Sequence, residues 1–524
     1  MKLSLIAPGK NPGCERNFSV DFFAFGPLIM IALLSLFALA LAPRNALGAE
    51  AEPEISAPNI LIILADDLGW RDVSYHGSEI RTPQIDQIAR EGIELDRFYV
   101  QPTCSPTRSG LMTGKSPLRL GITSPISKNQ KEGLALDERI LPQYLEEAGY
   151  QSLMVGKWHL GHHTLDQFPQ ARGFESFYGL LTGGVGYWDH NHGGGHDWQR
   201  NGETLREEGY STTLIADEAI RVLAGRDTSR PHFLYVAFNA PHLPNEAPHE
   251  AISLYPAISD PKRRIHAAMV SELDAAIGRV LEAYESQGLL ENTLILFASD
   301  NGGLNQNGVP QALKTVTTAL SNVFGRPIPS EGLEFITSNV QDGASNNFPL
   351  SGAKGSVLEG GVRVPAAIYW PGKLKPRKHE GFISVSDVLP TLLEAIGKSE
   401  SIPTDLAGTS QWQALLGNET NLETPDYATY GLEGMALYRA PWKLIDPDSP
   451  RLYHIYDDPK EKRDRAAEEP EIVEELVAAA EDWPAGGSVA SKIIDMLFDP
   501  DRFGGPEDRD PWADVARERS STRP

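Results

Sequence analysis

The sequence predicts an α/β protein: helices flank a large, mostly parallel central sheet, and a smaller C-terminal α+β subdomain of antiparallel strands and a helix follows. From Pro58 onward, apolar β-rich runs alternate with amphipathic helical stretches, which is the pattern of parallel strands covered by helices. The chain has 524 residues, of which 41% are hydrophobic. That is enough to bury the core of one large domain and a smaller one.

The strands of the main sheet are expected at the apolar runs, and the helices where apolar residues recur every three or four positions. The predicted strands are Asn59–Leu64, Ser152–Val155, His232–Phe238, Thr293–Phe297 and Val364–Trp370. The predicted helices include Leu214–Ala224 and Arg264–Glu285.

A change of composition near Thr404–Thr424 marks the start of the C-terminal part. We therefore expect a main domain over 58–403, a subdomain over 404–483 and a tail over 484–524. The tail is rich in Gly, Pro, Asp and Arg, which is typical of a segment that wraps the surface or is disordered. The elements expected in the subdomain are short strands within Tyr427–Asp446 and Arg451–Tyr456 and an acidic helix at Pro470–Trp483.

Residues 1–48 have the order of a secretory signal peptide, since basic residues precede the apolar run Leu28–Ala42 and small residues follow it. Extended back to Phe22, the run approaches the ~20 residues that span a bilayer, so an uncleaved membrane anchor is the alternative. Either reading predicts an exported protein, periplasmic or secreted, that meets a membrane only if this segment is not cleaved.

The charge balance bears on possible partners. The chain has 47 Lys and Arg against 71 Asp and Glu, a formal net charge of −24. No nucleic-acid partner is expected, because such binding rests on neutralising phosphates. A small anionic substrate remains compatible, because salt screens surface charge over about 8 Å and a pocket can be locally positive.

Polar residues follow four of the predicted strands, at the carboxyl ends where open α/β sheets bind ligands. A single polar end can be a helix cap or a turn, but four at one edge of a sheet indicate a binding site. The four ends are Asp66-Asp67, Gly156–His159, Asn239–His242 and Ser299–Gly303.

The side chains at these ends fall into two chemical groups. Lys157 and His159 are two apart on an extended segment, so their side chains should face the same way. Together with His242, Arg108 and Lys354, these two residues are expected to form a wall of cationic side chains opposite a bound metal ion. A metal ion and such a wall suit a tetrahedral oxyanion ester. The other group offers oxygen ligands, which suit a hard cation such as Ca²⁺ or Mg²⁺: Asp66, Asp67, Asp300 and Asn301.

Cys104 opens the segment Cys104–Gly114, which is expected to be the first turn of a helix after a loop. Pro106 is tolerated there because first-turn N–H groups have no intrahelical partner, and these free groups favour an anion. The only other cysteine, Cys14, lies in the leader, so the mature chain would keep one thiol. A lone cysteine is either a reactive residue or a small buried hydrophobe.

At these motifs the chain resembles the type I, formylglycine-dependent sulfatases of the alkaline-phosphatase superfamily. The C-x-P-x-R motif at Cys104–Arg108, followed by Leu-x-Thr-Gly, is highly specific, and the resemblance spans residues 58–483. It also includes Asp66-Asp67-Leu-Gly-Trp, Gly156-Lys-Trp-His-Leu-Gly, Ala240-Pro-His242, Asp300-Asn-Gly-Gly and Lys354–Pro365.

The resemblance implies an alkaline-phosphatase-like fold and hydrolysis of a sulfate monoester, with a sulfated carbohydrate as the expected substrate. A maturation enzyme would convert Cys104 to formylglycine (3-oxoalanine), whose hydrate attacks sulfur. Implied ligands of one Ca²⁺ are Asp66, Asp67, Asp300, Asn301 and the modified Cys104.

The resemblance also implies roles for the cationic residues. Arg108 would fix the hydrate, and Lys157 and Lys354 would bind sulfate oxygens. His242, with Lys354, would protonate the leaving alcohol, and His159 would help to regenerate the aldehyde. Two rivals remain: a phosphonate monoester or phosphodiester hydrolase with the same nucleophile, and a non-catalytic glycan-binding relative.

Two further segments have a less specific pattern. Residues 187–198 hold three histidines and two tryptophans in a Gly-rich run, compatible with a sugar-binding or pocket-lining loop, a transition-metal site or a structural loop. Residues 304–347 are long for a connection in a compact domain. They include the helix-like stretch Pro310–Phe324, and we expect them to line or cover the pocket.

Overall fold

The computed structural model describes residues 57–128, 130–192, 195–305, 343–418, 425–484 and 510–522. The predicted leader 1–48 and the predicted helix Pro310–Phe324 lie outside these ranges. Within them, no helix has the length and hydropathy that a membrane span needs.

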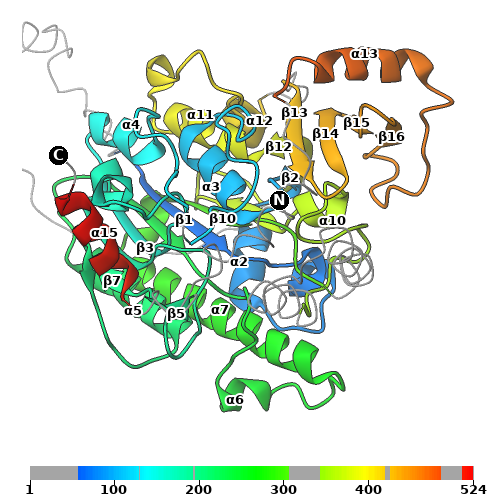
Figure 1. Ribbon diagram of the computed structural model, residues 1–524. Coiled ribbons are helices and arrows are strands. Elements are labelled where there is room, and N and C mark those ends of the chain that lie inside the picture. The colour runs from blue at the N-terminus through cyan, green and yellow to red at the C-terminus, as the bar shows by residue number, and fades with distance from the viewer. Residues whose placement is uncertain are drawn as a thin grey trace, which may run out of the picture. The chain divides into compact units, whose positions relative to one another are not determined.

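A ten-stranded mixed sheet forms the centre of the main domain (Figure 1). Five central strands run parallel: β10 (Thr293–Ser299), β1 (Asn59–Ala65), β9 (His232–Ala237), β3 (Gln151–Lys157) and β4 (Ser176–Leu180). The remaining strands are β2 (Ile93–Tyr99), β11 (Ala366–Tyr369), β12 (Arg377–Ser384), β7 (Gln199–Arg200) and β8 (Glu203–Thr204). The strand order is β12-β2-β11-β10-β1-β9-β3-β4-β7-β8, which confirms the predicted mostly parallel sheet.

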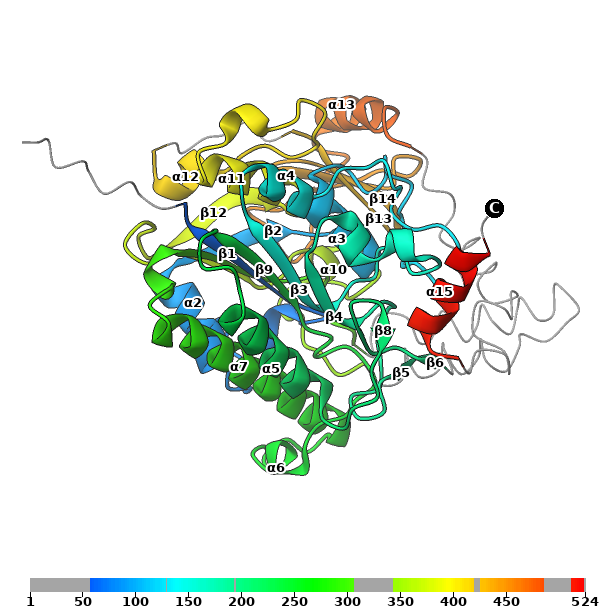
Figure 2. The ribbon, with the colours of Figure 1, turned by 90° about the vertical axis from the view of Figure 1, so that its left-hand side faces the viewer.

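Both faces of the sheet are covered because its central strands are apolar on both sides. Along β1, Ile60 and Ile62 pack into one core cluster, whereas Leu61 and Ile63 pack into the other. Figure 2 shows helices above and below the sheet. One face is covered by α2 (Pro83–Glu91), α5 (Ser211–Ala224) and α7 (Pro261–Ser286). The other face is covered by α3 (Cys104–Thr113), α4 (Leu141–Glu147), α11 (Val388–Ala395) and α12 (Trp412–Leu416).

Several short elements connect these layers. They are the helices α6 (His249–Ile252) and α10 (Glu359–Val362) and the two-stranded ribbon of β5 (Asn191–His192) and β6 (Gly195–His196). Short 3-10 turns lie at Trp70–Asp72, Ser74–His76, Leu165–Gln167, Pro169–Arg172, Leu290–Asn292, Val385–Asp387 and Ser399–Ser401.

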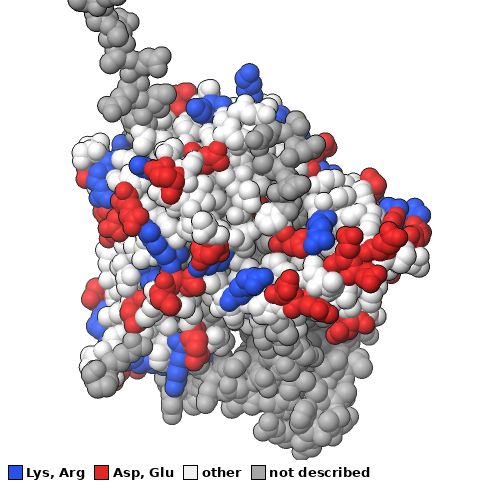
Figure 3. All heavy atoms as spheres, turned by 90° about the horizontal axis from the view of Figure 1, so that it is seen from above, with Lys and Arg blue, Asp and Glu red and all other residues white. Residues whose placement is uncertain are grey.

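A second, four-stranded antiparallel sheet follows in the C-terminal part, as predicted. It consists of β13 (Tyr427–Gly431), β14 (Gly434–Arg439), β15 (Trp442–Ile445) and β16 (Arg451–His454). One face packs under the acidic helix α13 (Pro470–Ala480), and the other packs against Tyr99, Val357 and Phe382 of the main domain. Figure 3 views the molecule from above, and acidic side chains gather on its right-hand side, which is the side where α13 lies in Figure 1. The boundaries 58–403 and 404–483 stay a prediction.

The structure adds elements that the sequence pattern did not indicate. β2 and β12 were not predicted, and β11, which lies within the predicted strand Val364–Trp370, runs antiparallel to both of its neighbours. The predicted tail contains the helix α15 (Trp512–Ser521). Its Trp512 indole donates a hydrogen bond of 3.2 Å to the carbonyl of His192.

Candidate active site

The carboxyl ends of four adjacent parallel strands bring the predicted site residues together. Backbone bonds fix these ends: Asp66 N–H donates to the Ala240 carbonyl after β9, and Asp300 N–H donates to the Ala65 carbonyl of β1, each at 3.0 Å. Lys157 is the last residue of β3. Because neighbouring parallel strands end at the same edge, side chains far apart in the sequence meet there.

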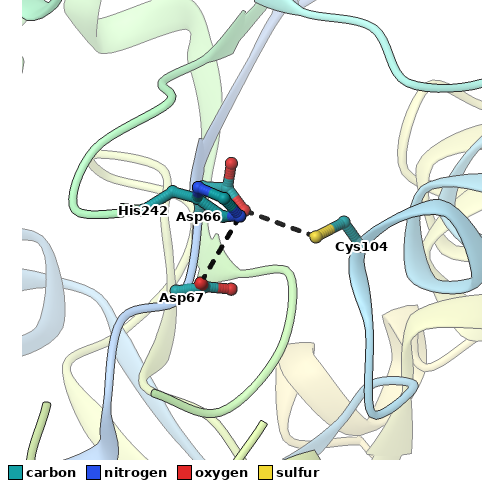
Figure 4. A group of neighbouring side chains, drawn as sticks. All are labelled: Asp66, Asp67, Cys104 and His242. Atoms are coloured by element: carbon teal, nitrogen blue, oxygen red, sulfur yellow. Dashed lines mark hydrogen bonds and ion pairs between the residues drawn. The ribbon is translucent and has the colours of Figure 1, made fainter. Parts of the chain in front are cut away.

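Cys104 is the first residue of α3, after the extended residue Thr103. It is 2% exposed, and its Sγ lies 3.6 Å from Asp66 Oδ1 (Figure 4). Burial raises the pKa of the Cys104 thiol to about 12, although Lys157 and Lys354 act in the opposite direction. Since the thiolate is the reactive form of cysteine, an unmodified Cys104 is a poor nucleophile at neutral pH.

The ammonium groups of two lysines contact the two carboxylates that follow β1. Lys157 Nζ donates to Asp66 Oδ2 at 2.6 Å with both side chains fully buried. Lys354 Nζ lies 2.8 Å from Asp67 Oδ2 and 2.7 Å from its Oδ1. Burial alone would raise the pKa of Asp67, but Lys354 and, less strongly, His242 hold it well below its usual range.

Arg108 and Asp300 form a second buried pair beside these lysines. The Nε and Nη2 atoms of Arg108 both donate to Asp300 Oδ2, at 3.0 and 2.8 Å, and its Nη1 donates to the Lys157 carbonyl at 2.8 Å. Burial and the neighbouring Asp66 raise the pKa of Asp300 to about 6, against the attraction of Arg108. Arg108 therefore ties the Asp300 turn to the end of β3.

Lys157, Lys354 and Arg108 each pair with a carboxylate, because buried charges need partners in direct contact. The wall of cations expected opposite a metal ion stays a prediction. The premise that Lys157 and His159 share an extended segment is wrong, since His159 has a φ of 60°. Its Nε2 contacts the Ile126 carbonyl at 3.0 Å, while its buried Nδ1 has no hydrogen-bond partner within the described ranges. Burial, then Lys157 and Arg108, lower the pKa of His159 well below its ordinary value.

His242 faces Asp67 from the segment after β9, with its Nε2 3.7 Å from Asp67 Oδ2. Its Nδ1 donates to the Leu243 carbonyl at 2.7 Å, which leaves the lone pair on Nε2, toward Asp67. Burial, then Lys354, lower the pKa of His242 to about 3. The Tyr187 hydroxyl donates to the His242 carbonyl at 2.8 Å and so fixes its backbone.

The pattern of the sequence did not indicate the glycines that pack against the two imidazole rings. A Cβ at Gly183 would lie 3.0 Å from His159 Cε1, and a Cβ at Gly184 would lie 3.0 Å from His242 Nδ1. Side chains at these positions would displace both rings. The sequence signal for this contact is the Gly183-Gly184 pair, which begins three residues after β4.

The residues at this edge fit a hard cation. Ligand atoms of Asp66, Asp67, Cys104 and His242 lie within 4.8 Å of one another (Figure 4). The amide nitrogen of Asn301 donates to Asp67 Oδ1 at 2.6 Å, but its Oδ1 is buried and has no hydrogen-bond partner among the described residues. Buried amide oxygens are normally satisfied, and one that lies beside carboxylates matches the ligands of Ca²⁺. His242 lies among these ligand atoms but offers a nitrogen, whereas Ca²⁺ prefers oxygen ligands, so His242 does not join the predicted ligands.

The histidines of residues 187–198 point in different directions. The His190 ring stacks on Trp198 at 4.5 Å, and His196 Nε2 contacts the Leu205 carbonyl at 2.6 Å. Burial, then Lys128 and His242, lower the pKa of His192 to about 3. Among the described residues, none of the three joins the cluster of candidate metal ligands, so the structure gives the transition-metal reading no support.

The predicted pocket-lining segment 304–347 is described only at its two ends. There, Ser345 Oγ donates to the Asp67 carbonyl at 3.2 Å, and Asn347 Nδ2 donates to the Gly303 carbonyl at 2.8 Å. Its C-terminal end therefore braces the loops that carry Asp67 and Asp300. The rest of this expectation lies outside the described residues.

Comparison with known proteins shows the family. A family model described as Sulfatase matches residues 58–398. Arylsulfatase J of Mus musculus is 35% identical over 422 residues, covering 76% of this chain and 64% of that protein. N-acetylgalactosamine-6-sulfatase of Canis lupus familiaris is 31% identical over 398 residues, covering 71% and 68%. The chain thus matches just under two thirds of the length of arylsulfatase J.

A solved structure is also similar. The crystal structure of Ps i-CgsB in complex with k-i-k-neocarrahexaose is 28% identical with a TM-score of 0.72, and the match covers 86% of this chain and 100% of that one. With the family model, this confirms the predicted architecture. The chain belongs to the sulfatase family of the alkaline-phosphatase superfamily.

Proposed function

We propose that this protein hydrolyses a sulfate monoester of a carbohydrate, using formylglycine made from Cys104. One observation carries the proposal: Cys104 begins α3, buried, 3.6 Å from a carboxylate in a cluster of candidate metal ligands. Its thiol is too basic to act unmodified at neutral pH, so conversion to formylglycine accounts for its place in the site. The proposed Ca²⁺ ligands are Asp66, Asp67, Asp300, Asn301 and the modified Cys104.

The substrate class is proposed from relatives and from the site's surroundings. One relative is named N-acetylgalactosamine-6-sulfatase, and another was solved with the oligosaccharide k-i-k-neocarrahexaose. Beside His242, the loop 187–198 presents Trp188, which is 49% exposed and lies 5.1 Å from the Tyr210 ring. A supported, exposed aromatic face suits a sugar ring.

The cationic side chains would bind the sulfate group. Lys157 and Lys354 already point at Asp66 and Asp67, and their ammonium groups can share their hydrogen bonds with sulfate oxygens. A bound Ca²⁺ would offset the charge of the sulfate and of the surrounding carboxylates. Arg108, held by Asp300 and the Lys157 carbonyl, would hold the residue at position 104 in place.

Two imidazoles and one ammonium group would move the protons. His242 Nε2 and Lys354 Nζ both face Asp67, and we assign protonation of the leaving alcohol to this pair, in which Lys354 is the member that carries a proton on the side of Asp67. The unpartnered Nδ1 of His159 would accept a proton when sulfate is released. The formylglycine hydrate supplies the hydroxyl that attacks sulfur and a second hydroxyl whose loss of a proton releases sulfate.

The N-terminal segment 1–48 and the need for formylglycine complete the proposal. Export through this segment would place the protein in the periplasm or outside the cell. A separate maturation enzyme would have to act on Cys104 for the protein to become active.

Parallel rate measurements test the proposal. The protein, co-expressed with a maturation enzyme, is assayed with an aryl sulfate, sulfated monosaccharides, an aryl phosphodiester and a phosphonate monoester. The proposal predicts the highest kcat/KM on a sulfate ester. A higher value on the diester or phosphonate would favour the phosphoester hydrolase. Glycan binding without sulfate release, with Cys104 converted, would favour a non-catalytic binding protein.

A further inference from the structure

The segment 351–363, here termed the Lys354 segment, carries Lys354 to Asp67. Two backbone bonds hold it beside the other catalytic loops. Lys354 N–H donates to the Gly303 carbonyl at 3.2 Å, and Gly355 N–H donates to the Pro102 carbonyl at 2.8 Å. Gly303 lies in the turn after β10, and Pro102 comes two residues before Cys104. The position of Lys354 is therefore coupled to the loops that carry Asp300 and Cys104.

The turn between β13 and β14 approaches the same peptide from the C-terminal sheet. Leu432 N–H donates to the Gly355 carbonyl at 2.8 Å, so the residue after Lys354 is held from two sides. A Cβ at Gly431 would lie 2.6 Å from the Gly355 oxygen. The close approach of the two chains therefore requires glycine at position 431.

Glu433, in the same turn, holds the next two residues of the Lys354 segment. Its Oε1 accepts a hydrogen bond from the Ser356 hydroxyl at 2.6 Å, and its Oε2 accepts one from Val357 N–H at 2.9 Å. Hydrogen bonds to a charged acceptor are stronger than neutral ones. One side chain of the C-terminal sheet thus fixes a stretch that begins two residues after Lys354.

A buried ion cluster fixes the C-terminal end of the Lys354 segment to the same sheet. Lys443 Nζ of β15 lies 3.1 Å from Glu359 Oε1 and 2.6 Å from Glu461 Oε1. Glu461 Oε2 accepts from Glu359 N–H at 2.7 Å. The C-terminal sheet therefore holds the Lys354 segment at two places, through Glu433 close to Lys354 and through Lys443 and Glu461 at Glu359.

We propose that the β13–β14 turn positions Lys354 for sulfate binding, with Glu433 as the positioning residue. This inference rests on the proposed function, in which Lys354 binds a sulfate oxygen. Glu433 reaches Lys354 only through the backbone of residues 355–357, and it is not among the residues that surround Asp67. Since catalysis depends strongly on small displacements of such groups, loss of the Glu433 bonds should weaken sulfate binding.

The test compares Glu433→Ala with Glu433→Gln and a control variant in the same sheet. The control, Asp426→Ala, removes the Arg439–Asp426 pair, whose two contacts of 2.8 and 2.7 Å do not involve the Lys354 segment. For each protein, kcat and KM on an aryl sulfate, inhibition by inorganic sulfate, bound Ca²⁺ and Tm are measured. Glutamine can accept from Val357 N–H and donate to the Ser356 hydroxyl, so it should rescue function.

For Glu433→Ala we expect kcat/KM to fall and the sulfate inhibition constant to rise, each about tenfold, which corresponds to about one charge-assisted hydrogen bond. Bound Ca²⁺ should not change. Glu433→Gln and Asp426→Ala should stay within about twofold of the wild type in both constants.

Unchanged sulfate inhibition in Glu433→Ala, with or without a lower Tm, would overturn the inference and leave the proposed function intact. An equal loss of sulfate binding in Asp426→Ala would also overturn it, because the sheet would then act only through general stability. If the wild type neither hydrolyses sulfate esters nor binds inorganic sulfate, the proposed function fails, and this inference fails with it.

Discussion

Two of the buried clusters of charged side chains in the described part of the chain differ in how completely their polar atoms are paired. Where the C-terminal sheet meets the main domain, Lys443 contacts Glu359 and Glu461, and the remaining oxygens of both carboxylates accept hydrogen bonds from Tyr99 and from a backbone N–H. At the strand ends, the amide oxygen of Asn301 is buried and has no partner in the part of the chain that the structure describes. The strand-end cluster comprises Asp66, Asp67, Asp300, Asn301, Lys157 and Lys354.

The difference separates a structural cluster from a binding site. A buried ion pair contributes little net stability when complete but is costly to break, so the cluster around Lys443 needs nothing further. An unpaired buried oxygen among carboxylates carries a desolvation cost that a cation can remove. Removing a charge should therefore harm stability in the first cluster and mainly ligand binding and activity in the second.

The largest effect is expected at Cys104. Cys104→Ala should lower kcat/KM on a sulfate ester by a factor on the order of 10⁴, as loss of a covalent nucleophile does, while the free energy of unfolding changes by about 1 kcal/mol. Enzyme kinetics and urea unfolding measure the two effects. Retention of substantial activity would remove Cys104 from the mechanism.

Lys443→Met, in the structural cluster, should mainly lower the free energy of unfolding and not the activity. It removes the cation between two buried carboxylates and leaves Glu359 only the longer contact to Arg363 Nη1 at 3.8 Å, which should lower the free energy of unfolding by about 3–5 kcal/mol. Denaturant unfolding measures this loss. Lys443→Met combined with Glu461→Gln is the matched control, and it should recover part of the stability because one of the two carboxylates is neutralised. A single variant as stable as the wild type would contradict the distinction between the clusters.

Calcium should stabilise the protein through the strand-end cluster. At a free Ca²⁺ concentration of about 100 times Kd, the free energy of unfolding should rise by about 2.7 kcal/mol, seen as a higher Tm than in EGTA. Asn301→Ala should reduce this difference, whereas Asn418→Ala, at an exposed position, should leave it unchanged. An equal Ca²⁺ effect in all three proteins would exclude Asn301 as a ligand.

The buried carboxyl group of Asp72 should make a smaller, pH-dependent contribution to the free energy of unfolding. Burial alone would raise its pKa, but Arg263 and His266 lower it from 3.8 to about 2. A carboxyl with a lowered pKa in the folded state stabilises the protein above the unfolded pKa, so about 2 kcal/mol should be lost as the pH falls from about 4 to about 2. Urea unfolding across this range should show a steeper loss for the wild type than for Asp72→Asn. Parallel curves would contradict the assignment.

Much of the central sheet could be predicted because its strands are buried on both faces and read as apolar runs. β2 and β12 could not, because charged residues interrupt their apolar pattern. Those charges pair across the strands, since Lys378 of β12 lies 3.2 Å from Glu94 and 2.7 Å from Asp96 of β2. A pattern of single residues cannot show such pairing, which depends on the register of the two strands.

The sequence predicted which strand ends meet at the candidate site, but not how the side chains there pair with one another. The motifs place Asp66, Lys157 and Asp300 at one edge of the sheet, where the structure also has them. They do not show that Lys157 forms an ion pair with Asp66, because burial and desolvation decide which charged groups pair. Nor do they indicate that Glu433 accepts hydrogen bonds from Ser356 and Val357, because the β13–β14 turn is distant in the sequence from the Lys354 segment.

Peptide mass spectrometry across Cys104, on protein from its own host or co-expressed with a maturation enzyme, tests the central claim most directly. The account predicts a peptide roughly 18 Da lighter than the thiol form, the loss expected when the nucleophile precursor becomes an aldehyde. An unmodified Cys104 in the native host would contradict it, because a buried thiol with a pKa of about 12 offers neither the attacking hydroxyl nor a way to release sulfate.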